Sequence, residues 1–458
     1  MFEQYARSLK AFPIKVFSFM GFWLPIGFGA NASAQEQPKP DESSKTEEVL
    51  EDNQYDWQNS HPVDISAIRF VPGKGLRIES RDKNFALETR LRIQYRIDVN
   101  QSEEDFSDDE DRIQIAAMLR RARLQFTGNL WGPKTKFKAE FAMAPRDLGM
   151  TGSDNPPIVN GDQRVSRSPL LDWYIQFEQL RDLTVRMGQY KVPYSRERVI
   201  SSGDLQFVDR TILNREFTVD RDIGFDIRSS DLFGLDKRLR YAIGIYAGEG
   251  HSSYQSNDLN LMSLARLEYL PFGDFKDYKQ SDLSRTEFTG LSFGLGVARV
   301  QGGKGSRGII GRRFADEGTT DYDNLNFDIA FKKQGYSLDA VYFRRYGTRN
   351  PGSATDDNGG LIAVTEARNG WGYGAQGGYL FANDMEVATR YSKIVGSEGT
   401  TSLQDVEEAG IGVSYYLASH LFKWQADYLK FWGEGDNDSG ADFDDARDQL
   451  RVQMQIAF

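Results

Sequence analysis

Basic side chains recur at every second position in several segments, and this spacing is the feature of the chain that could do chemistry. Arg90, Arg92 and Arg96 alternate with apolar residues, and so do Lys136 and Lys138. In an extended strand, that alternation places the basic side chains on one face and the apolar side chains on the other. Arginine presents planar donors that match the oxygens of phosphate. The spacing therefore indicates a surface that binds or conducts anions.

Histidine and cysteine are too scarce for most catalytic or metal chemistry. The chain has no cysteine, which excludes thiol catalysis, disulfides and cysteine-based zinc sites. Its three histidines are His61, His251 and His420, and none falls inside an expected strand. No nucleophile motif or paired-carboxylate site accompanies them. We therefore expect no catalytic residue, no metal and no cofactor. The net charge of −11 also argues against a nucleic-acid partner.

Residues 1–34 have the features of a secretory signal peptide. Basic residues precede an apolar stretch, and Ala32-Ser33-Ala34 offers small residues at the spacing of a cleavage site. The alternative is a membrane anchor, but a spanning helix needs about 20 apolar residues and this stretch is shorter. Residues 35–75 are expected to form an acidic, polar linker. The folded part is then expected to span residues 76–458.

The folded part repeats a pattern of about ten residues in which apolar and polar side chains alternate, as in transmembrane β-strands. About sixteen such segments occur, near 85–97, 112–126, 136–143, 171–177, 183–192, 223–229, 239–247, 260–270, 288–299, 324–332, 336–345, 371–381, 385–393, 408–417, 421–431 and 447–458. Bacterial barrels require an even number. The predicted fold class is all-β, a transmembrane antiparallel β-barrel of about 16 strands. A soluble all-β protein with one wet sheet face is the alternative.

The connections between these segments support the barrel, because long and short connections alternate. Short ones, such as Leu180 to Asp182 and Lys333 to Gly335, span about three residues. Long loops at one end and tight turns at the other are typical of an outer-membrane barrel. The last segment alternates up to the terminal Phe458 and resembles the closing strand of such a barrel.

Several strings, taken in order, carry a family resemblance. They include GQYKVPYSRE (188–197), SSGDLQFVDRTILN (201–214), RDIGFDIR (221–228) and MEVATRYS (385–392). From about residue 85 to the C-terminus, the chain resembles the phosphate-selective porins of Gram-negative outer membranes. The resemblance implies a trimeric barrel of sixteen strands in the outer membrane. It also implies inward-folded loops and rows of Arg and Lys that select anions, notably phosphate.

The longest connection lies between about Pro193 and Asp222, and a loop of such length is usually functional. It is the third long loop, and in similar porins the third external loop folds into the lumen, so we expect the same here. Among its basic residues, Arg198 and Arg210 are the favoured lumen contacts. The loop also carries many carboxylates, so the alternative is that its arginines pair with neighbours and hold the loop against the wall.

The parity of the apolar positions changes within residues 112–126, and a β-bulge near Arg120–Arg121 would reconcile the two halves. On the lipid face, Arg or Lys costs about 2–4 kcal/mol at the bilayer midplane, so we expect the basic residues to face inward. The candidate anion-contacting, pore-lining residues are Arg90, Arg92, Arg120, Arg121, Arg123, Lys136, Lys138, Arg186, Arg198, Arg210, Arg215 and Arg221.

The sequence therefore predicts a passive outer-membrane diffusion channel that prefers anions, with phosphate or polyphosphate as candidate solutes. Expected partners are small anions, outer-membrane lipid, lipopolysaccharide and, from the resemblance, further copies in a homotrimer. Inward carboxylates leave a general or weakly cation-selective porin as the alternative. An outer-membrane barrel enzyme is a remote one, and a barrel that only anchors the acidic tail is another. The acidic runs 102–111 and 436–445 are expected to be solvated external loops.

Overall fold

The computed structural model describes residues 65–102, 113–148, 168–252, 261–399, 401–433 and 446–458. These residues belong to one compact unit, Trp57–Phe458. The predicted signal peptide and residues 35–64 of the predicted linker lie outside the described residues. The same holds for residues 103–111 and 436–445 of the acidic runs. In the described ranges, no helix is both long and apolar enough to cross a membrane.

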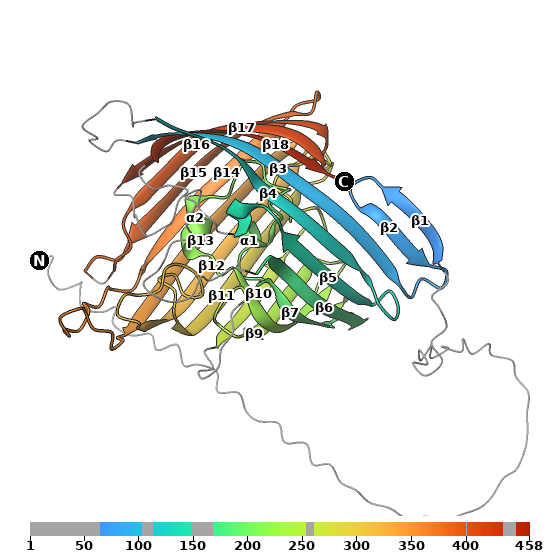
Figure 1. Ribbon diagram of the computed structural model, residues 1–458. Helices are drawn as coiled ribbons and strands as arrows, with labels where there is room; N and C mark the ends of the chain where they lie inside the picture. Colours follow the sequence, from blue (N-terminus) through green and yellow to red (C-terminus); the bar gives the residue numbers. More distant parts are fainter. Residues whose placement is uncertain (1–64, 103–112, 149–167, 253–260, 400, 434–445) are drawn as a thin grey trace, which may run out of the picture. The chain divides into compact units, whose positions relative to one another are not determined.

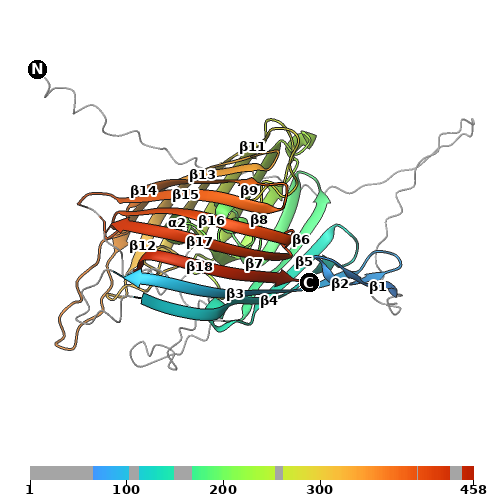
Figure 2. The same ribbon diagram turned by 90° about the horizontal axis from the view of Figure 1, so that it is seen from above.

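Sixteen strands of the described chain form one closed antiparallel barrel, so the predicted fold is confirmed. Each strand pairs with the next one along the chain, and β18 pairs with β3 to close the ring, as Figure 2 shows. The strands are β3(Ala86–Ser102), β4(Ile113–Asn129), β5(Thr135–Ala142), β6(Leu170–Leu180), β7(Leu183–Lys191), β8(Arg221–Ser229), β9(Leu239–Tyr246), β10(Met262–Tyr269), β11(Gly290–Gly303), β12(Thr319–Lys333), β13(Tyr336–Asn350), β14(Gly370–Leu380), β15(Met385–Gly396), β16(Val406–Ala418), β17(Phe422–Gly433) and β18(Ala446–Ala457). They coincide with the sixteen segments in which the sequence alternates.

The barrel wall separates an apolar outer surface from a polar interior. On β8, Ile223 and Phe225 are exposed, whereas Asp222 and Asp226 are buried. Successive side chains of a strand point to opposite faces, so each strand places its polar set inside the ring. Outward-facing aromatic residues such as Trp424 are also exposed. An apolar exterior of this kind suits a lipid environment.

The β-bulge that the parity change predicted is present in β4. Gln94 of β3 pairs with Arg121, and the next residue, Tyr95, pairs with Leu119. Arg120 is therefore the extra residue in β4, and a bulge of this kind re-aims the side chains on its two sides. As a result Arg121 and Arg123 are both buried inside the barrel.

A hairpin outside the ring extends the sheet at β3. β1(Ile65–Val71) pairs with β2(Gly75–Ser80), and β2 pairs with the first residues of β3. Residues 65–71, which the sequence placed in the polar linker, thus form a strand. The turn depends on Gly75, which has a φ of 73°, and a Cβ there would lie 1.9 Å from the Thr89 carbonyl oxygen.

The tight turns fall where the sequence predicted them, with one exception at the same end of the barrel. The β6–β7, β12–β13, β14–β15 and β16–β17 connections are short. The β10–β11 connection, residues 270–289, joins strands at that same end but is long. Its middle is buried, with Asp277 3% and Ser281 2% exposed. The expected alternation of long and short connections is therefore wrong at this one position.

The β7–β8 connection, residues 192–220, lies inside the barrel, as the sequence predicted for the third long loop. It contains two short helices, α1(Arg196–Val199) and α2(Ile212–Phe217), which lie within the ring of strands (Figure 1). The Thr211 hydroxyl oxygen caps α2 by accepting a hydrogen bond from the Asn214 backbone N–H at 3.1 Å. Two 3₁₀ turns, η3(Pro145–Leu148) and η4(Leu232–Gly234), complete the described helical elements.

Candidate functional site

The β7–β8 loop packs one of its sides against the strands of the second half of the barrel. Leu205, Phe207, Leu213 and Phe217 are each about 1% exposed or less. Phe217 stacks on Phe343 of β13, with ring centroids 5.7 Å apart. Burying each such side chain contributes roughly 1.5–3 kcal/mol relative to leaving it in water. The apolar residues of the loop thus fix this side of it to the wall.

Polar contacts reinforce the same side of the loop. Glu216 of α2 accepts hydrogen bonds from Arg345 at 2.7 Å and from Arg368 at 2.8 Å. Further along, Gln206 donates to Glu386 of β15 at 2.7 Å. The Val208 backbone N–H donates to Asp427 of β17 at 2.9 Å. Buried charged and polar groups are therefore paired along this side, as a low-dielectric interior requires.

Arg196 is the most heavily paired cation of the loop. It is 2% exposed and forms ion pairs with Asp328 of β12 at 2.9 Å and with Asp277 of the β10–β11 connection. Glu268 of β10 lies 3.7 Å from it. With three carboxylates around one guanidinium, Arg196 contributes no net positive charge to the interior.

The other side of the loop presents three cations that have no carboxylate partner among the described residues. Arg92 of β3 donates to the hydroxyls of Ser201 at 2.7 Å and Ser202 at 3.0 Å. The ends of Lys191 and Arg210 converge on one acceptor, the Ile200 carbonyl oxygen, at 3.1 Å and 2.6 Å. We call Arg92, Lys191 and Arg210 the unpaired cluster. Hydroxyl and carbonyl oxygens orient these cations but leave their charge uncancelled.

A glycine lets Arg92 approach the loop this closely. A Cβ at Gly203 would lie 2.4 Å from Nη1 of Arg92. Any larger residue would displace the guanidinium, because real Cβ contacts do not reach that distance. The position of Arg92 against the loop thus depends on Gly203.

Most of the other residues proposed from the sequence lie in ion pairs. Arg120 and Arg121 contact Asp209 at 3.3 and 3.1 Å, and Arg123 contacts Asp147 at 2.6 Å. The remaining pairs are Lys136 with Glu178, Lys138 with Glu140 and Asp172, Arg198 with Asp220, and Arg221 with Asp172. These cations therefore follow the alternative prediction, in which inward cations pair with neighbouring carboxylates.

Three further candidates have other surroundings. Arg186 donates to Gln176 at 2.7 Å and lies over the rings of Tyr174 and Tyr190. Arg90 is partly exposed on β3, and its buried Nε has no hydrogen-bond partner in the described residues. Arg215 lies in α2 and is partly exposed.

The carboxylates of the loop differ in their electrostatics. Burial alone would raise the pKa of Asp209, but the guanidinium groups of Arg121, Arg120 and Arg96 hold it well below its usual range. Glu216 behaves in the same way, because Arg368 and Arg345 lower its pKa against the effect of burial. Both carboxylates therefore stay charged at neutral pH and remain available to their cation partners.

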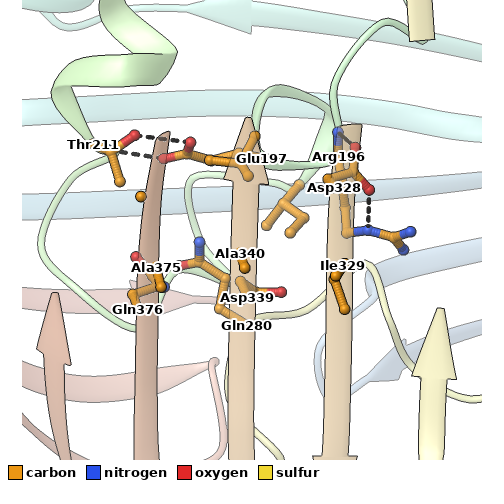
Figure 3. Close-up of a pocket in the computed structure, with 13 residues that line it drawn as sticks. Arg196, Glu197, Thr211, Gln280, Asp328, Ile329, Asp339, Ala340, Ala375 and Gln376 are labelled. Carbon is orange, nitrogen blue, oxygen red and sulfur yellow. Dashed lines mark hydrogen bonds and ion pairs between the residues drawn. The ribbon is translucent and has the colours of Figure 1, made fainter. Parts of the chain in front are cut away.

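A cavity separates part of the loop from strands β12, β13 and β14 (Figure 3). It has an empty volume of about 390 Å³ and is lined in part by Arg196, Glu197, Thr211 and Asp339. Glu197 accepts hydrogen bonds from the Thr211 backbone N–H at 2.8 Å and from its hydroxyl at 2.9 Å. Burial raises the pKa of Glu197.

No group of three or more His, Asp or Glu among the described residues could hold a metal ion.

Sequence reasoning missed Lys191, Ser201 and Ser202. Lys191 is the last residue of β7, next to Tyr190, whose hydroxyl donates to Asp226 inside the barrel. Strict alternation would therefore turn Lys191 outward, and only the departure of the chain into the loop turns it toward Ile200. The serines carry no charge, and their role depends on meeting Arg92, which is more than a hundred residues away.

Comparison with known proteins gives a family match for part of the chain. Residues 89–243 match the model of the family described as phosphate-selective porin O and P. The predicted resemblance is confirmed over these residues. In sequence, no curated protein matches the chain.

Solved structures share the fold. The chain is similar to the anion-selective porin from Comamonas acidovorans, with a TM-score of 0.52 and 12% sequence identity over 82% of this chain and 100% of that one. It is also similar to OmpT, an outer membrane protein of Vibrio cholerae, with a TM-score of 0.50 and 10% identity over 82% of this chain and 98% of that one. The closed barrel, its apolar exterior and the family match are those of an outer-membrane channel.

Proposed function

We propose that the protein is a passive outer-membrane channel that prefers anions and conducts phosphate among them. The observation that carries the proposal is the unpaired cluster. Arg92, Lys191 and Arg210 meet around Ile200 to Ser202 and make no ion pair among the described residues. Lys191 and Arg210 are partly exposed, so a passing anion can reach them.

The surroundings of this cluster support anion passage rather than tight anion binding. Each cation is already held by one or two neutral oxygens, and an anion that reaches the remaining donors adds a charge-assisted contact. Conduction requires sites that attract an ion but release it again, and several weak contacts in sequence meet that requirement. Arg90 and Arg186, which also lack carboxylate partners in the described chain, extend the series along the β3 and β7 wall.

Phosphate suits this series for two reasons. It carries one to two negative charges near neutral pH, and its oxygens match the planar donors of arginine. The family matched by residues 89–243 is described as phosphate-selective, and the similar porin from Comamonas acidovorans is described as anion-selective. Both descriptions support the proposal.

The cellular setting proposed for this channel follows the same family resemblance. We propose export by a cleaved signal peptide within residues 1–34, insertion in contact with outer-membrane lipid and lipopolysaccharide, and assembly as a homotrimer. The polar linker proposed for residues 35–75 then precedes the barrel, with Ile65–Val71 forming a strand at its end.

Phosphate block of the chloride current tests the proposed solute. In planar bilayers, adding phosphate should reduce the chloride current through the purified channel, because both anions use the same cations. Arg210→Gln should weaken the block, whereas Arg299→Gln should leave it unchanged. Arg299 lies on β11, is half exposed and pairs with Asp323 at 3.5 Å. A chloride current that phosphate does not reduce would exclude phosphate as a solute.

A general or weakly cation-selective porin is the competing function. The ion pairs of Arg121, Arg123, Lys138 and Arg221 favour it, because paired rows leave little net positive charge in the lumen. The two functions differ in the sign of the reversal potential under a potassium chloride gradient.

A further inference from the structure

The long β10–β11 connection, residues 270–289, enters the barrel from the end opposite to the β7–β8 loop. Strand-borne cations hold it there. Lys332 of β12 is 2% exposed and donates to the carbonyl oxygens of Lys276 at 2.7 Å and Ser281 at 3.0 Å. Arg240 of β9 contacts Asp277 at 3.1 Å. The connection is thus tied to the wall on both sides.

The connection also contacts the β7–β8 loop directly. Asp277 forms an ion pair with Arg196 at the start of that loop. The Gln280 backbone N–H donates to the Asp204 carbonyl oxygen at 3.2 Å. The Gln280 side-chain oxygen accepts from the Gln206 backbone N–H at 2.9 Å. Two segments that enter from opposite ends of the barrel therefore meet in its interior.

The far end of the connection is fixed as well. The Ser281 hydroxyl donates to Glu386 of β15 at 2.7 Å, and the same carboxylate accepts from Tyr416 of β16 at 2.6 Å. Asp282 accepts from the Gly335 backbone N–H in the β12–β13 turn at 2.9 Å. The middle of the connection therefore spans from β9 to β16 inside the barrel.

We propose that residues 270–289 form a second constriction segment, and that Asp277 is a positioning residue that keeps the β7–β8 loop docked through Arg196. Docking fixes α1 against β10 and β12, and the side chains of Lys191 and Arg210, which are partly exposed, contact the Ile200 carbonyl oxygen at the end of α1. Release of Asp277 lets the loop leave that position and widens the path. The inference rests on the channel activity but not on the preference for phosphate.

Single-channel recording of Asp277→Asn tests the proposal. Asp277→Asn removes one of the three carboxylates around Arg196, and losing one charged contact should raise the population of the undocked loop about tenfold. We expect a larger mean conductance and more frequent current fluctuations than in the parent channel. Asp274→Asn is the matched control, because Asp274 lies in the same segment but is 40% exposed in its contacts with Lys237 and Arg240. Asp277→Asn channels that conduct like the parent would overturn the proposal.

A disulfide cross-link between the two segments tests the same contact in a second way, first in a channel that keeps Asp277. The chain has no cysteine, so Asp204→Cys and Gln280→Cys introduce a single possible disulfide between the two segments. Oxidation should form it readily, because the two backbones are in hydrogen-bond contact. Added to Asp277→Asn, the oxidised cross-link should restore the parent conductance, and a reductant should remove the effect. A pair that does not cross-link in the folded barrel would contradict the placement of residues 270–289.

The readouts separate this proposal from the proposed function. Conductance and fluctuations report the width and the docking of the loop, whereas phosphate block reports the solute. A channel that phosphate does not block can still widen on Asp277→Asn, and a phosphate-blocked channel can remain unchanged by it.

Discussion

Two sets of cations around the β7–β8 loop differ in their partners. On the side that faces β10–β17, Arg196 lies among three carboxylates, and Arg345 and Arg368 share Glu216. By contrast, Arg92, Lys191 and Arg210 contact only hydroxyl and carbonyl oxygens, although Arg96 and Arg121 on neighbouring strands pair with Asp209 of the loop. Disrupting the first arrangement costs a large part of the free energy of unfolding. The second arrangement leaves positive charge that can attract anions.

This difference separates the groups that hold the loop from the groups that meet the solute. A buried cation with carboxylate partners stabilises a position, because removing either partner leaves an uncompensated charge. A cation held by neutral oxygens keeps its place and still attracts anions from the path. The same loop can therefore be firmly anchored and functionally charged.

The largest effect is expected on the paired side, from Glu216→Ala. The variant leaves Arg345 and Arg368 without their shared carboxylate, at a cost of about 3–5 kcal/mol in the free energy of unfolding. The midpoint of guanidinium chloride unfolding, followed by tryptophan fluorescence, measures this loss. Asp323→Ala is the control, because Asp323 is 60% exposed on the outer face and should leave the midpoint unchanged. If Glu216→Ala and Asp323→Ala unfolded at the same denaturant midpoint, the paired cations would not stabilise the fold more than exposed ones.

A smaller effect is expected on the pH dependence of stability, and the variant Asp209→Asn measures the contribution of Asp209 to it. The pKa of Asp209 is depressed in the folded protein, against the effect of burial, by Arg121, Arg120 and Arg96. A carboxylate whose pKa is lower in the folded than in the unfolded protein stabilises the fold at pH values above its unfolded pKa of about 4. This contribution is lost as the pH falls through the lower folded pKa. The stability difference between the parent and Asp209→Asn should therefore stay constant from pH 7 to about pH 5 and shrink on further acidification. A difference that grows as the pH falls would contradict the assigned ion pairs.

Much of the wall could be predicted from the sequence, because period-two alternation is a local signal. The sixteen strands, the tight turns and the bulge at Arg120 follow from which side chains are apolar. The inward position of the β7–β8 loop came from its length and from the family resemblance. Each of these features depends on residues close together in the chain or on a known family.

The pairing of the charges could not be predicted, because it depends on contacts between distant segments. Arg198 was a favoured anion contact, yet it pairs with Asp220 at the other end of the same loop. Residues 270–289 contain four acidic and three basic residues and show no alternation, so nothing in them indicates that Lys332 and Arg240 hold them inside the barrel. Lys191 lies where strict alternation points outward.

The reversal potential under a potassium chloride gradient tests the central claim most directly. The account predicts an anion-selective parent channel whose preference falls strongly in the triple variant Arg92→Gln, Lys191→Gln and Arg210→Gln. The double variant Arg198→Gln and Asp220→Asn, which removes a paired cation together with its carboxylate, should keep the preference of the parent. A cation-selective parent, or a triple variant with the reversal potential of the parent, would contradict the account.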